Sequence, residues 1–327
     1  LHQPQNFPFE QTWFFDPFDR DARRRYKMLC WPYEQGIEGG PGVLAYSADG
    51  ATWRLEPRHR WYTHPRGSDT INNLFYNPFT GRWCAVCRKR NADRRVALVE
   101  SADLEHWTSP RVIIHPDSLD APLQQFYGMA AGLYEGEYFI GWLQNYRVNS
   151  TEAAGRIKMQ GAVDGQLAYS YDGETWLRTD RTTQLPRGEP GSATGGGIYP
   201  SAMTPAPDGG LYVYCLATAH DHGFPDPRRE YLVVCPFRRD GFAWLEPVGG
   251  WGTVLTRTLV PTGGSCRLNF LAPAGAVLVQ AATPNREPIP GYTFDDSLPL
   301  RGDRTAAPVR WKKHRDLSGL AGRPIRL

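Results

Sequence analysis

The sequence contains no long hydrophobic run, and this absence excludes a membrane-spanning helix. Such a helix needs about 20 consecutive, mostly apolar residues, and no stretch of the 327-residue chain approaches that length. The mean hydropathy is −0.50. The opening residues LHQPQNFPFE also lack the basic and apolar segments of a secretory signal. We therefore expect a soluble chain that does not enter a membrane, and its compartment stays unknown.

No charge of one sign dominates the sequence. Lysine and arginine number 37 against 34 aspartates and glutamates, so the net charge is +3. Proteins that bind nucleic acid through bulk charge carry a basic stripe or face, and no long basic stretch stands out here. We expect no nucleic-acid partner.

The motifs of several enzyme classes are missing as well. The chain has no phosphate-binding glycine loop, no dinucleotide-binding fingerprint, no nucleophile elbow and no HExxH zinc motif. Cys84 and Cys87 form one CxxC, but no second pair completes a zinc site, and the run RWCAVCRK is typical of a strand. We expect buried free thiols there, with metal or redox use as the alternative, and we expect no cofactor.

Glycine, proline and aromatic residues are abundant. The chain holds 34 glycines, 28 prolines and 13% aromatic residues. Turn-forming residues mixed with aromatic ones favour many short strands, and no segment has a convincing helical period. The composition therefore predicts an all-β fold.

One turn motif recurs along the chain. It reads SADGATW at 47–53, SADLEHW at 101–107 and SYDGETW at 170–176, and a degenerate copy, RDGFAW, lies at 239–244. We expect the aspartate to cap a tight turn, the glycine to take a positive φ and the tryptophan to pack into the layer below. The tryptophans are 54, 69 and 68 residues apart, and such periods in a strand-rich chain predict propeller blades.

A predicted β-hairpin precedes each of these turns. Hairpin and turn together make a unit of about four strands, which is the size of a propeller blade. Four such units lie at 7–60, 69–115, 124–180 and 197–248. We expect a five-bladed β-propeller over residues 1–252. Residues 253–327 then form a complete or partial β-sandwich, or strands that close the propeller.

The repeated turns carry a family resemblance. Together with the runs MQGAVDGQLAYSYDGETWLRT and RRDGFAWLEP and the later GYTFDDSLPLRGDRTAAPVRW, they resemble a large group of bacterial glycoside-hydrolase-like proteins. That group is related in architecture to the five-bladed propellers of glycoside hydrolase families 32, 43 and 68. The resemblance implies hydrolysis or transfer of a glycosidic bond in a carbohydrate, with furanosides among the candidates, by paired carboxylates without a cofactor. Family 32 members also carry a β-sandwich after the propeller.

The segment WFFDPFD at 13–19 allows two interpretations. It is similar to the family 32 signature WMNDPNG at Trp13, Asp16 and Pro17, and the resemblance would make Asp16 the nucleophile. However, the internal repeat aligns Asp16-Pro17 with Asn77-Pro78, at a hairpin tip that cannot reach a central funnel. The RDP and EC signatures of family 32 are absent. We therefore look for the catalytic carboxylates elsewhere.

Propeller geometry indicates where a site should lie, because the first residues of the innermost strands converge in a funnel. Glycoside cleavage needs an acid and a second carboxylate that acts as base or nucleophile. Asp69 is our candidate base or nucleophile, Asp120 a second carboxylate with Asp117 as its alternative, and Glu189 the acid. Each has a structural alternative, which is a capped turn for Asp69 and an exposed loop for the others.

Five further side chains are predicted to bind the substrate. Asn73, Tyr127 and Tyr199 lie where inner strands begin, and the tyrosines could stack on sugar faces or simply pack between blades. Arg88 ends a strand and could bind a sugar or form a salt bridge at the rim. His222, in the run ATAHDHG, is expected to contact a substrate hydroxyl. The HxH spacing also suits a metal ion, but we expect no metal.

Two other functions remain open. A glycan-binding propeller would keep the aromatic funnel without catalysis, and the same fold could serve an enzyme that acts on another small polar metabolite. The deciding feature is a pair of carboxylates that face each other about 5–10 Å apart. The sequence leaves the sugar, the linkage and the oligomeric state undetermined.

Overall fold

The computed structural model describes residues 12–30, 42–63, 68, 70–90, 93–152, 159–225 and 229–327. Within these ranges every regular element is a strand, apart from two 3₁₀ helices of one turn each, Ala22–Arg24 and Ser318–Leu320. The all-β prediction is therefore confirmed. None of the helices in this part of the chain has the length or the apolar character needed to cross a membrane.

The chain divides into two compact units. The first comprises Leu1–Thr204 and Tyr212–Cys235, and the second comprises Pro205–Leu211 and Pro236–Leu327. The boundary predicted between residues 252 and 253 falls inside the second unit, so the assignment of 253–327 to a separate domain stays a prediction.

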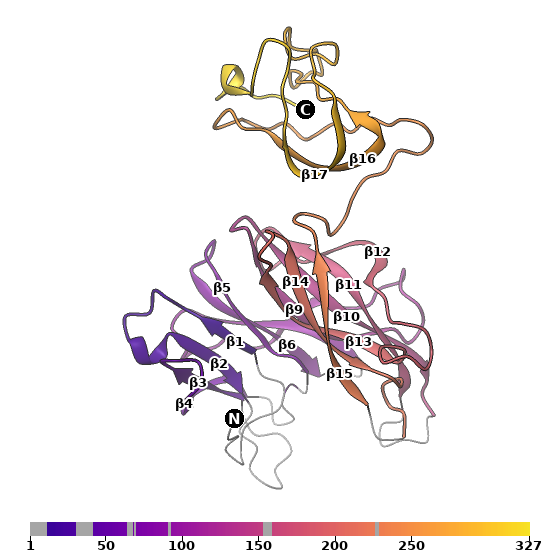
Figure 1. Cartoon of the computed structure of the whole chain (residues 1–327). Helices are drawn as coiled ribbons and strands as arrows, with labels where there is room; N and C mark the ends of the chain where they lie inside the picture. Colours follow the sequence, from indigo (N-terminus) through magenta and orange to yellow (C-terminus); the bar gives the residue numbers. More distant parts are fainter. Residues whose placement is uncertain are drawn as a thin grey trace. The chain divides into compact units, whose positions relative to one another are not determined.

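The first unit begins with two four-stranded antiparallel sheets (Figure 1). The first sheet consists of β1 (Thr12–Phe15), β2 (Tyr26–Cys30), β3 (Gly42–Ser47) and β4 (Arg54–Tyr62). The second consists of β5 (Asn73–Asn77), β6 (Arg82–Arg90), β7 (Arg94–Ser101) and β8 (Arg111–Ile114). In both, consecutive strands are neighbours, which is the topology of a propeller blade.

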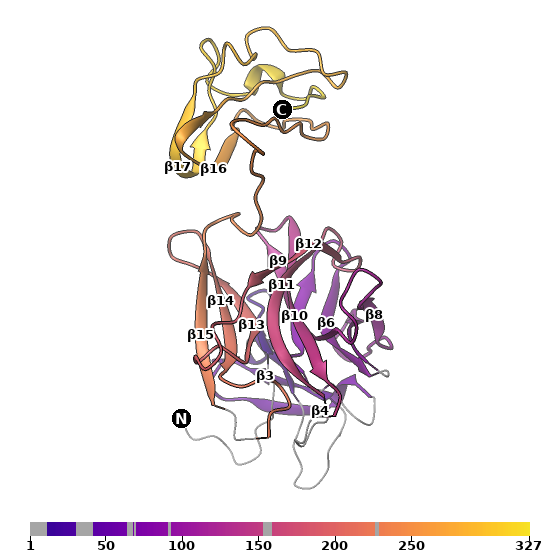
Figure 2. The same cartoon turned by 90° about the vertical axis from the view of Figure 1, so that its right-hand side faces the viewer.

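A third group of seven strands continues this plan, with β9, β10 and β11 lying side by side (Figure 2). Its first four strands are β9 (Gln125–Tyr134), β10 (Tyr138–Ser150), β11 (Gln160–Ser170) and β12 (Leu177–Leu185). The last three are β13 (Gly197–Pro205), β14 (Leu211–Thr218) and β15 (Glu230–Phe237). One parallel bridge, between Val163 and Gly197, joins the two sets.

The predicted units thus correspond to three four-stranded blades and one three-stranded blade. Within the described ranges the sheets do not close into a ring. A five-bladed propeller therefore stays a prediction, while the propeller-like arrangement of the first four units is observed.

The core of the first unit lies between neighbouring sheets. Leu44 and Trp61 of the first sheet pack in one apolar cluster with Val99 of β7. Leu98, the preceding residue on β7, packs in another cluster with Phe139 of the third sheet. Successive strand residues point to opposite faces, so the second sheet is buried on both faces, as a blade between two neighbours should be.

The recurring turn forms as predicted at 170–176. The Asp172 carboxylate accepts hydrogen bonds from two backbone N–H groups at 2.8 and 2.7 Å and from the Ser170 hydroxyl at 2.8 Å. Gly173 has a φ of 77°, and its carbonyl accepts a bond from the Trp176 indole at 3.1 Å. The aspartate is structural here, because it satisfies the backbone of the turn.

The copies at 47–53 and 101–107 repeat these contacts, but the copy at 239–244 does not. Leu104 takes the positive φ, 68°, in the second copy, where the other two have glycine. In the degenerate copy Trp244 is 72% exposed, and its indole donates to Glu246. The prediction is therefore confirmed for three copies and wrong for the fourth.

The β1–β2 hairpin decides between the two interpretations of WFFDPFD. Asp16 follows the last residue of β1 and accepts a bond from the backbone N–H two residues on, at 3.1 Å. Asn77, at the end of β5, makes the equivalent contact at 3.0 Å. The Asp16 carboxylate is also paired with Lys27 at 3.0 Å, and the Lys27 side chain is 1% exposed. The hairpin-tip interpretation is confirmed.

The CxxC pair lies on a strand, as its sequence indicated. Cys84 and Cys87 belong to β6, and both are buried free thiols. Burial raises the pKa of Cys84 to about 12 and raises that of Cys87 as well. Thiols of such high pKa are poor nucleophiles, so these two act as packing residues.

The second unit has its own small core. β16 (Arg267–Val277) pairs with β17 (Leu300–Pro308) in an antiparallel hairpin. The indole of Trp311, 2% exposed, donates to the Val279 carbonyl at 2.8 Å, and its ring contacts Tyr292. The remaining described pairing consists of isolated bridges such as that of Leu259 with Ile325. A β-sandwich here stays a prediction.

Candidate functional site

Four of the five residues predicted to bind substrate lie together in the first unit. Arg88 comes from β6, Tyr127 from β9 and Tyr199 from β13, while His222 follows β14. Tyr146 of β10 completes the group. We call these five residues the His222 cluster. Its members come from three of the four blade-like sheets, although they are far apart in the sequence.

The rings of the His222 cluster meet edge to face. The centroid of the Tyr127 ring lies 4.8 Å from that of His222, 5.6 Å from that of Tyr199 and 6.0 Å from that of Tyr146. The Tyr146 and His222 rings are 5.2 Å apart and nearly perpendicular, at 89°. Edge-to-face packing suits the charge distribution of aromatic rings, so Tyr127 is the centre of a stable aromatic arrangement.

Two arginines cover these rings. The Arg88 guanidinium carbon is 4.4 Å from the centroid of the Tyr127 ring, and Arg88 Nη2 donates to the Tyr127 carbonyl at 2.6 Å. Arg94, the first residue of β7, lies 5.2 Å from the Tyr146 centroid and 5.4 Å from that of Tyr127. A cation over a ring face is attracted by the ring quadrupole. The cluster is therefore aromatic and cationic.

A β-bulge brings Tyr127 to the centre of the cluster. Gln144 pairs with Gly128, but the next residue of β10, Asn145, pairs with Phe126. Tyr127 is thus an extra residue in β9 that has no partner in the β10 register. Bulges bend a strand and change where its side chains point, and they occur often beside active sites.

Tight backbone packing holds His222. The backbones of His222 and Gly161 exchange two hydrogen bonds, at 2.9 and 3.1 Å. A Cβ on Gly161 would lie 2.1 Å from the Arg147 carbonyl oxygen, so only glycine fits there. The His222 side chain is buried, with the residue 2% exposed. The segment after β14 is therefore fixed against the start of β11.

The segment before β5 contacts the cluster on both sides of Asp69. The Ser68 hydroxyl accepts a bond from the Arg88 backbone N–H at 2.8 Å, and the Thr70 hydroxyl donates to the Tyr127 carbonyl at 2.8 Å. Asp69 itself lies outside the described residues. Its role as base or nucleophile stays a prediction, although both of its chain neighbours contact members of the His222 cluster.

Asp120 is the centre of a buried ion-pair network. Its carboxylate lies 2.7 Å from Arg178 and 3.3 Å from Arg181, and it accepts bonds from Gln124 and from the Asp117 backbone N–H. Burial alone would raise the pKa of Asp120, but the hydrogen bonds from Arg178 and from the Asp117 backbone, together with the charges of the two arginines, outweigh it and lower the pKa.

Both oxygens of Asp120 are engaged, and its side chain is only 3% exposed. None of these partners belongs to the His222 cluster. Asp117, the alternative, is paired with Arg181 at 2.6 Å, which lowers its pKa. We conclude that these two carboxylates stabilise the loop before β9, and the site proposed below does not include them.

Glu189 is an exposed carboxylate on the loop that leads into β13. The loop is closed by backbone bonds, including one from the Gly188 N–H to the Thr194 carbonyl at 3.2 Å. Its last residues lie against the segment that carries His222, because the Gly196 N–H donates to the Thr218 carbonyl at 2.9 Å. Glu189 thus lies on the glycine-rich loop before β13, while its role as the acid stays a prediction.

Asn73 lies at the start of β5, as predicted, but its side chain has a structural partner. Its Oδ1 accepts a bond from the Ala131 backbone N–H at 2.9 Å, which joins β5 to β9. The contact links two neighbouring blades, and the structure does not place Asn73 among the rings of the cluster.

Sequence reasoning missed Tyr146 and Arg94, which both contact the cluster. It also missed Asp164, a carboxylate of 6% exposure that pairs with Asn145 at 3.0 Å and Arg147 at 2.5 Å. Asp164 and Asn145 are cross-strand partners, as are the adjacent Val163 and Tyr146. Strand alternation therefore points Asp164 away from the face that carries Tyr146.

The two histidines of the HxH motif face different rings. His220 stacks on Phe224 with centroids 4.6 Å apart, whereas His222 contacts Tyr127 and Tyr146. In the part of the chain that the structure describes, no three histidine, cysteine, aspartate or glutamate side chains are grouped to hold a metal ion. The geometry gives the HxH motif no shared metal position.

Comparison with known proteins gives matches among solved structures. No family model and no curated protein matches the chain. The chain is similar to an N-acetylgalactosamine deacetylase from F. plautii, solved with blood group B trisaccharide, with a TM-score of 0.53 and 16% identity over 71% of this chain and 73% of that one.

Two further solved structures have lower scores. A putative glycoside hydrolase from Parabacteroides distasonis gives a TM-score of 0.46 and 12% identity, over 72% of this chain and 70% of that one. The Bombyx mori family 32 β-fructofuranosidase gives 0.43 and 16%, over 85% of this chain and 57% of that one. The resemblance to glycoside-hydrolase-like propeller proteins is confirmed as a likeness of fold at low sequence identity.

Proposed function

We propose that the first unit binds a carbohydrate at the His222 cluster and hydrolyses a glycosidic bond there. The observation that supports this most is the convergence of Arg88, Tyr127, Tyr199 and His222 from three of the blade-like sheets. Aromatic rings offer apolar faces to sugar C–H groups, and arginine and histidine offer donors to hydroxyls. Tyr127 is partly exposed, so a ligand would reach the cluster at the Tyr127 ring.

The catalytic step needs two carboxylates with different tasks. One protonates the leaving oxygen, and the other activates water or attacks the sugar carbon. We assign the second task to Asp69, because both of its chain neighbours contact cluster residues. We assign the first to Glu189, because its loop is joined to the segment that carries His222.

A hydrolysis assay tests this assignment. A panel of nitrophenyl furanosides and pyranosides is incubated with the wild type, Asp69→Asn and Glu189→Gln. Loss of a general acid or base lowers the rate about 100-fold or more. Glu137→Gln is the matched control, because Glu137 is exposed in the β9–β10 hairpin at the opposite end of β9 from the cluster.

We expect one sugar to be cleaved by the wild type and by the control, and hardly at all by the other two folded variants. Full activity of Asp69→Asn and Glu189→Gln would contradict the assigned roles. Absence of cleavage across the panel would contradict glycoside hydrolysis of simple substrates.

The second candidate function is glycan binding without cleavage. The aromatic and cationic character of the described cluster favours it, together with the engagement of Asp120 in ion pairs. The F. plautii protein of similar fold is a deacetylase, so the fold alone does not fix the reaction. Retention of a glycan without hydrolysis, abolished by Tyr127→Ala, would favour this candidate.

A further inference from the structure

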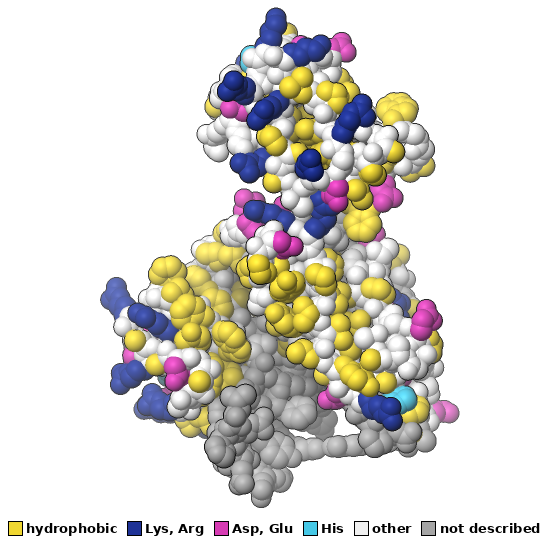
Figure 3. Space-filling model, in the orientation of Figure 1, with side chains coloured by type: hydrophobic (Ala, Val, Ile, Leu, Met, Phe, Trp, Pro, Cys, Tyr) yellow, Lys and Arg dark blue, Asp and Glu magenta, His cyan; other side chains and the backbone are white. Residues whose placement is uncertain are grey.

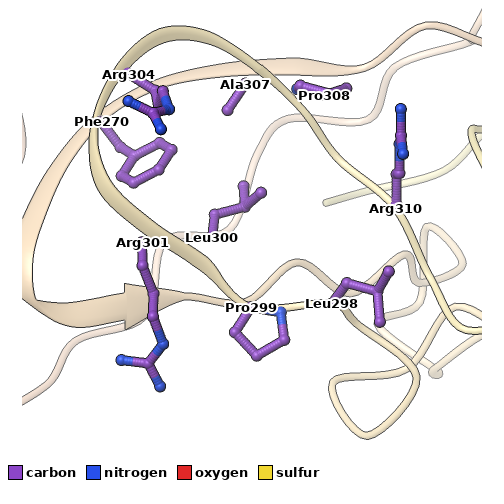
Figure 4. A pocket seen from close by; sticks show the side chains of 9 residues that line it. All are labelled: Phe270, Leu298, Pro299, Leu300, Arg301, Arg304, Ala307, Pro308 and Arg310. Carbon is purple, nitrogen blue, oxygen red and sulfur yellow. The ribbon is translucent and has the colours of Figure 1, made fainter.

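The second unit carries an open pocket that the proposed function does not use. It has a volume of about 330 Å³ and lies beside β17 (Figure 4). Three arginines line it, Arg301, Arg304 and Arg310, and no acidic residue does. Phe270 and Leu300 contribute apolar surface between them.

The described hydrogen bonds of Arg301 and Arg304 go to backbone carbonyls. Arg301 donates to the Gly275 carbonyl at 3.0 Å, and Arg304 donates to the backbone carbonyl of Asp303 at 3.2 Å. The Asp303 carboxylate is paired instead with Arg238, at 2.7 Å. Within the described residues, no carboxylate forms an ion pair with any of the three lining arginines.

The surrounding surface is basic as well. Residues 236–327 hold 13 lysines and arginines against 7 aspartates and glutamates, although the whole chain is nearly balanced. Figure 3 shows lysine and arginine side chains spread over the visible face of this unit. Such a distribution attracts anions and raises their local concentration.

We propose that this pocket binds the acidic sugars of a polysaccharide. The planar guanidinium fork matches the oxygens of a carboxylate or a sulfate group. The half-buried Phe270 ring and the Leu300 side chain offer an apolar surface to the C–H face of the same sugar. An anion beside an apolar ring face is the chemistry of a uronic acid or a sulfated sugar. The inference concerns a different unit from the His222 cluster and does not depend on the proposed hydrolysis.

Electrophoresis of the full chain in polysaccharide-containing gels tests the proposal. The gels contain polygalacturonate, a sulfated galactan or a neutral galactan. We compare the wild type with Arg304→Gln and Arg310→Gln in the pocket. Arg257→Gln and Arg323→Gln are matched controls, because both residues are exposed and outside the pocket.

We expect at least one acidic polymer to retard the wild type and the controls, while the neutral polymer does not. Loss of one charged hydrogen bond weakens binding about tenfold, so each pocket variant should need about tenfold more polymer for the same retardation. Retardation by polygalacturonate alone would show that the pocket binds a sugar carboxylate. Retardation by the sulfated galactan alone would show that it binds a sugar sulfate.

Three results would overturn the proposal. The first is equal retardation of the pocket variants and the controls. The second is retardation by the neutral polymer alone. The third is tight binding of single-stranded nucleic acid through the same arginines, without binding of the acidic polymers. The pocket variants should also cleave small nitrophenyl glycosides as the wild type does, so failure of this proposal and failure of the hydrolase assignment are distinguishable.

Discussion

Tyr127 reaches the centre of the His222 cluster because β9 carries one residue more than β10 at that point. The sequence could place Tyr127 and Tyr199 near a site, because both lie where inner strands begin. It could not predict the bulge, since no residue of QQFYGM marks it. Tyr146 was missed for a related reason, because it lies within a strand whose other aromatic residues, such as Trp142, are core residues.

The capping aspartates should make stability depend on pH. Burial raises the pKa of Asp172, but the backbone hydrogen bonds outweigh it and lower the pKa to about 2 from 3.8. A carboxylate with a lower pKa in the folded state stabilises the fold above its unfolded pKa, and this contribution is lost as the pH falls through the folded pKa.

We therefore expect Asp172→Ala to lower the free energy of unfolding by about 1 kcal/mol at pH 7, a modest value because the side chain is exposed. The difference from wild type should shrink as the pH falls from about 4 to about 2. Urea unfolding at several pH values measures this. A difference that is constant across that range would contradict the account.

Among the residues of the β1–β2 hairpin, we expect replacement of Lys27 to lower the free energy of unfolding most. It is buried and lies 3.0 Å from Asp16 and 2.8 Å from Asp19. Removing one partner of a buried ion pair leaves charge uncompensated, so Lys27→Met should destabilise the protein by about 3 kcal/mol. The control Arg23→Met removes an exposed ion pair and should change little. Urea unfolding of both variants at pH 7 compares them, and equal effects would show that the buried pair is not stabilising.

The recurring turns are the elements that the sequence predicted best. Their contacts are local, so a seven-residue pattern contains all the groups that make them. The fourth copy fails because Arg238 stands where the other copies have a serine, and the hydroxyl that binds both the aspartate and the turn N–H is missing. A pattern that matched only Asp-Gly and tryptophan could not detect this loss.

The turn at 170–176 also joins two blades. Asn77 of β5 donates to the Asp172 carbonyl at 2.6 Å, and a Cβ on Gly173 would lie 2.7 Å from the Asn77 side-chain nitrogen. Gly136 has a similar φ, 75° against 77°, but nothing lies within 4 Å of its Cβ position. The two glycines therefore differ in their surroundings and not in backbone conformation.

Gly136→Ala should cost about 1 kcal/mol for the positive φ alone. Gly173→Ala should lower the free energy of unfolding by at least about 1 kcal/mol more than Gly136→Ala does, because the methyl group would displace Asn77. Thermal and urea unfolding of the two variants give the comparison. Equal destabilisation would show that the contact between blades does not restrict the turn.

At the scale of the whole molecule, the sequence predicted an all-β chain and four blade-like units, because repeated motifs mark each unit. It did not predict where the second unit begins. The core of that unit brings Tyr292, Trp311 and Ile325 together with Val279, and these residues belong to no repeat. Contacts between segments without a common pattern leave no periodic signal in the sequence.

Two separate cores predict two separate unfolding events. Trp142 is fully buried in the first unit, and Trp311 is buried in the second. Replacing a buried tryptophan by alanine costs about 3–5 kcal/mol, so Trp142→Ala should increase hydrogen exchange in β9–β11 and Trp311→Ala in β16 and β17. Mass spectrometry measures the exchange. If either substitution affected both units equally, the chain would unfold as one cooperative body.

The most direct test of the carbohydrate site is saturation-transfer NMR with a panel of neutral monosaccharides. The wild type is compared with Tyr127→Leu and with Tyr171→Leu, in which the replaced tyrosine is 67% exposed and contacts no member of the cluster among the described residues. The account predicts transfer to at least one sugar from the wild type and from Tyr171→Leu, and its loss from a folded Tyr127→Leu. Equal transfer from all three proteins, or transfer to none of the sugars, would contradict a carbohydrate site at the His222 cluster.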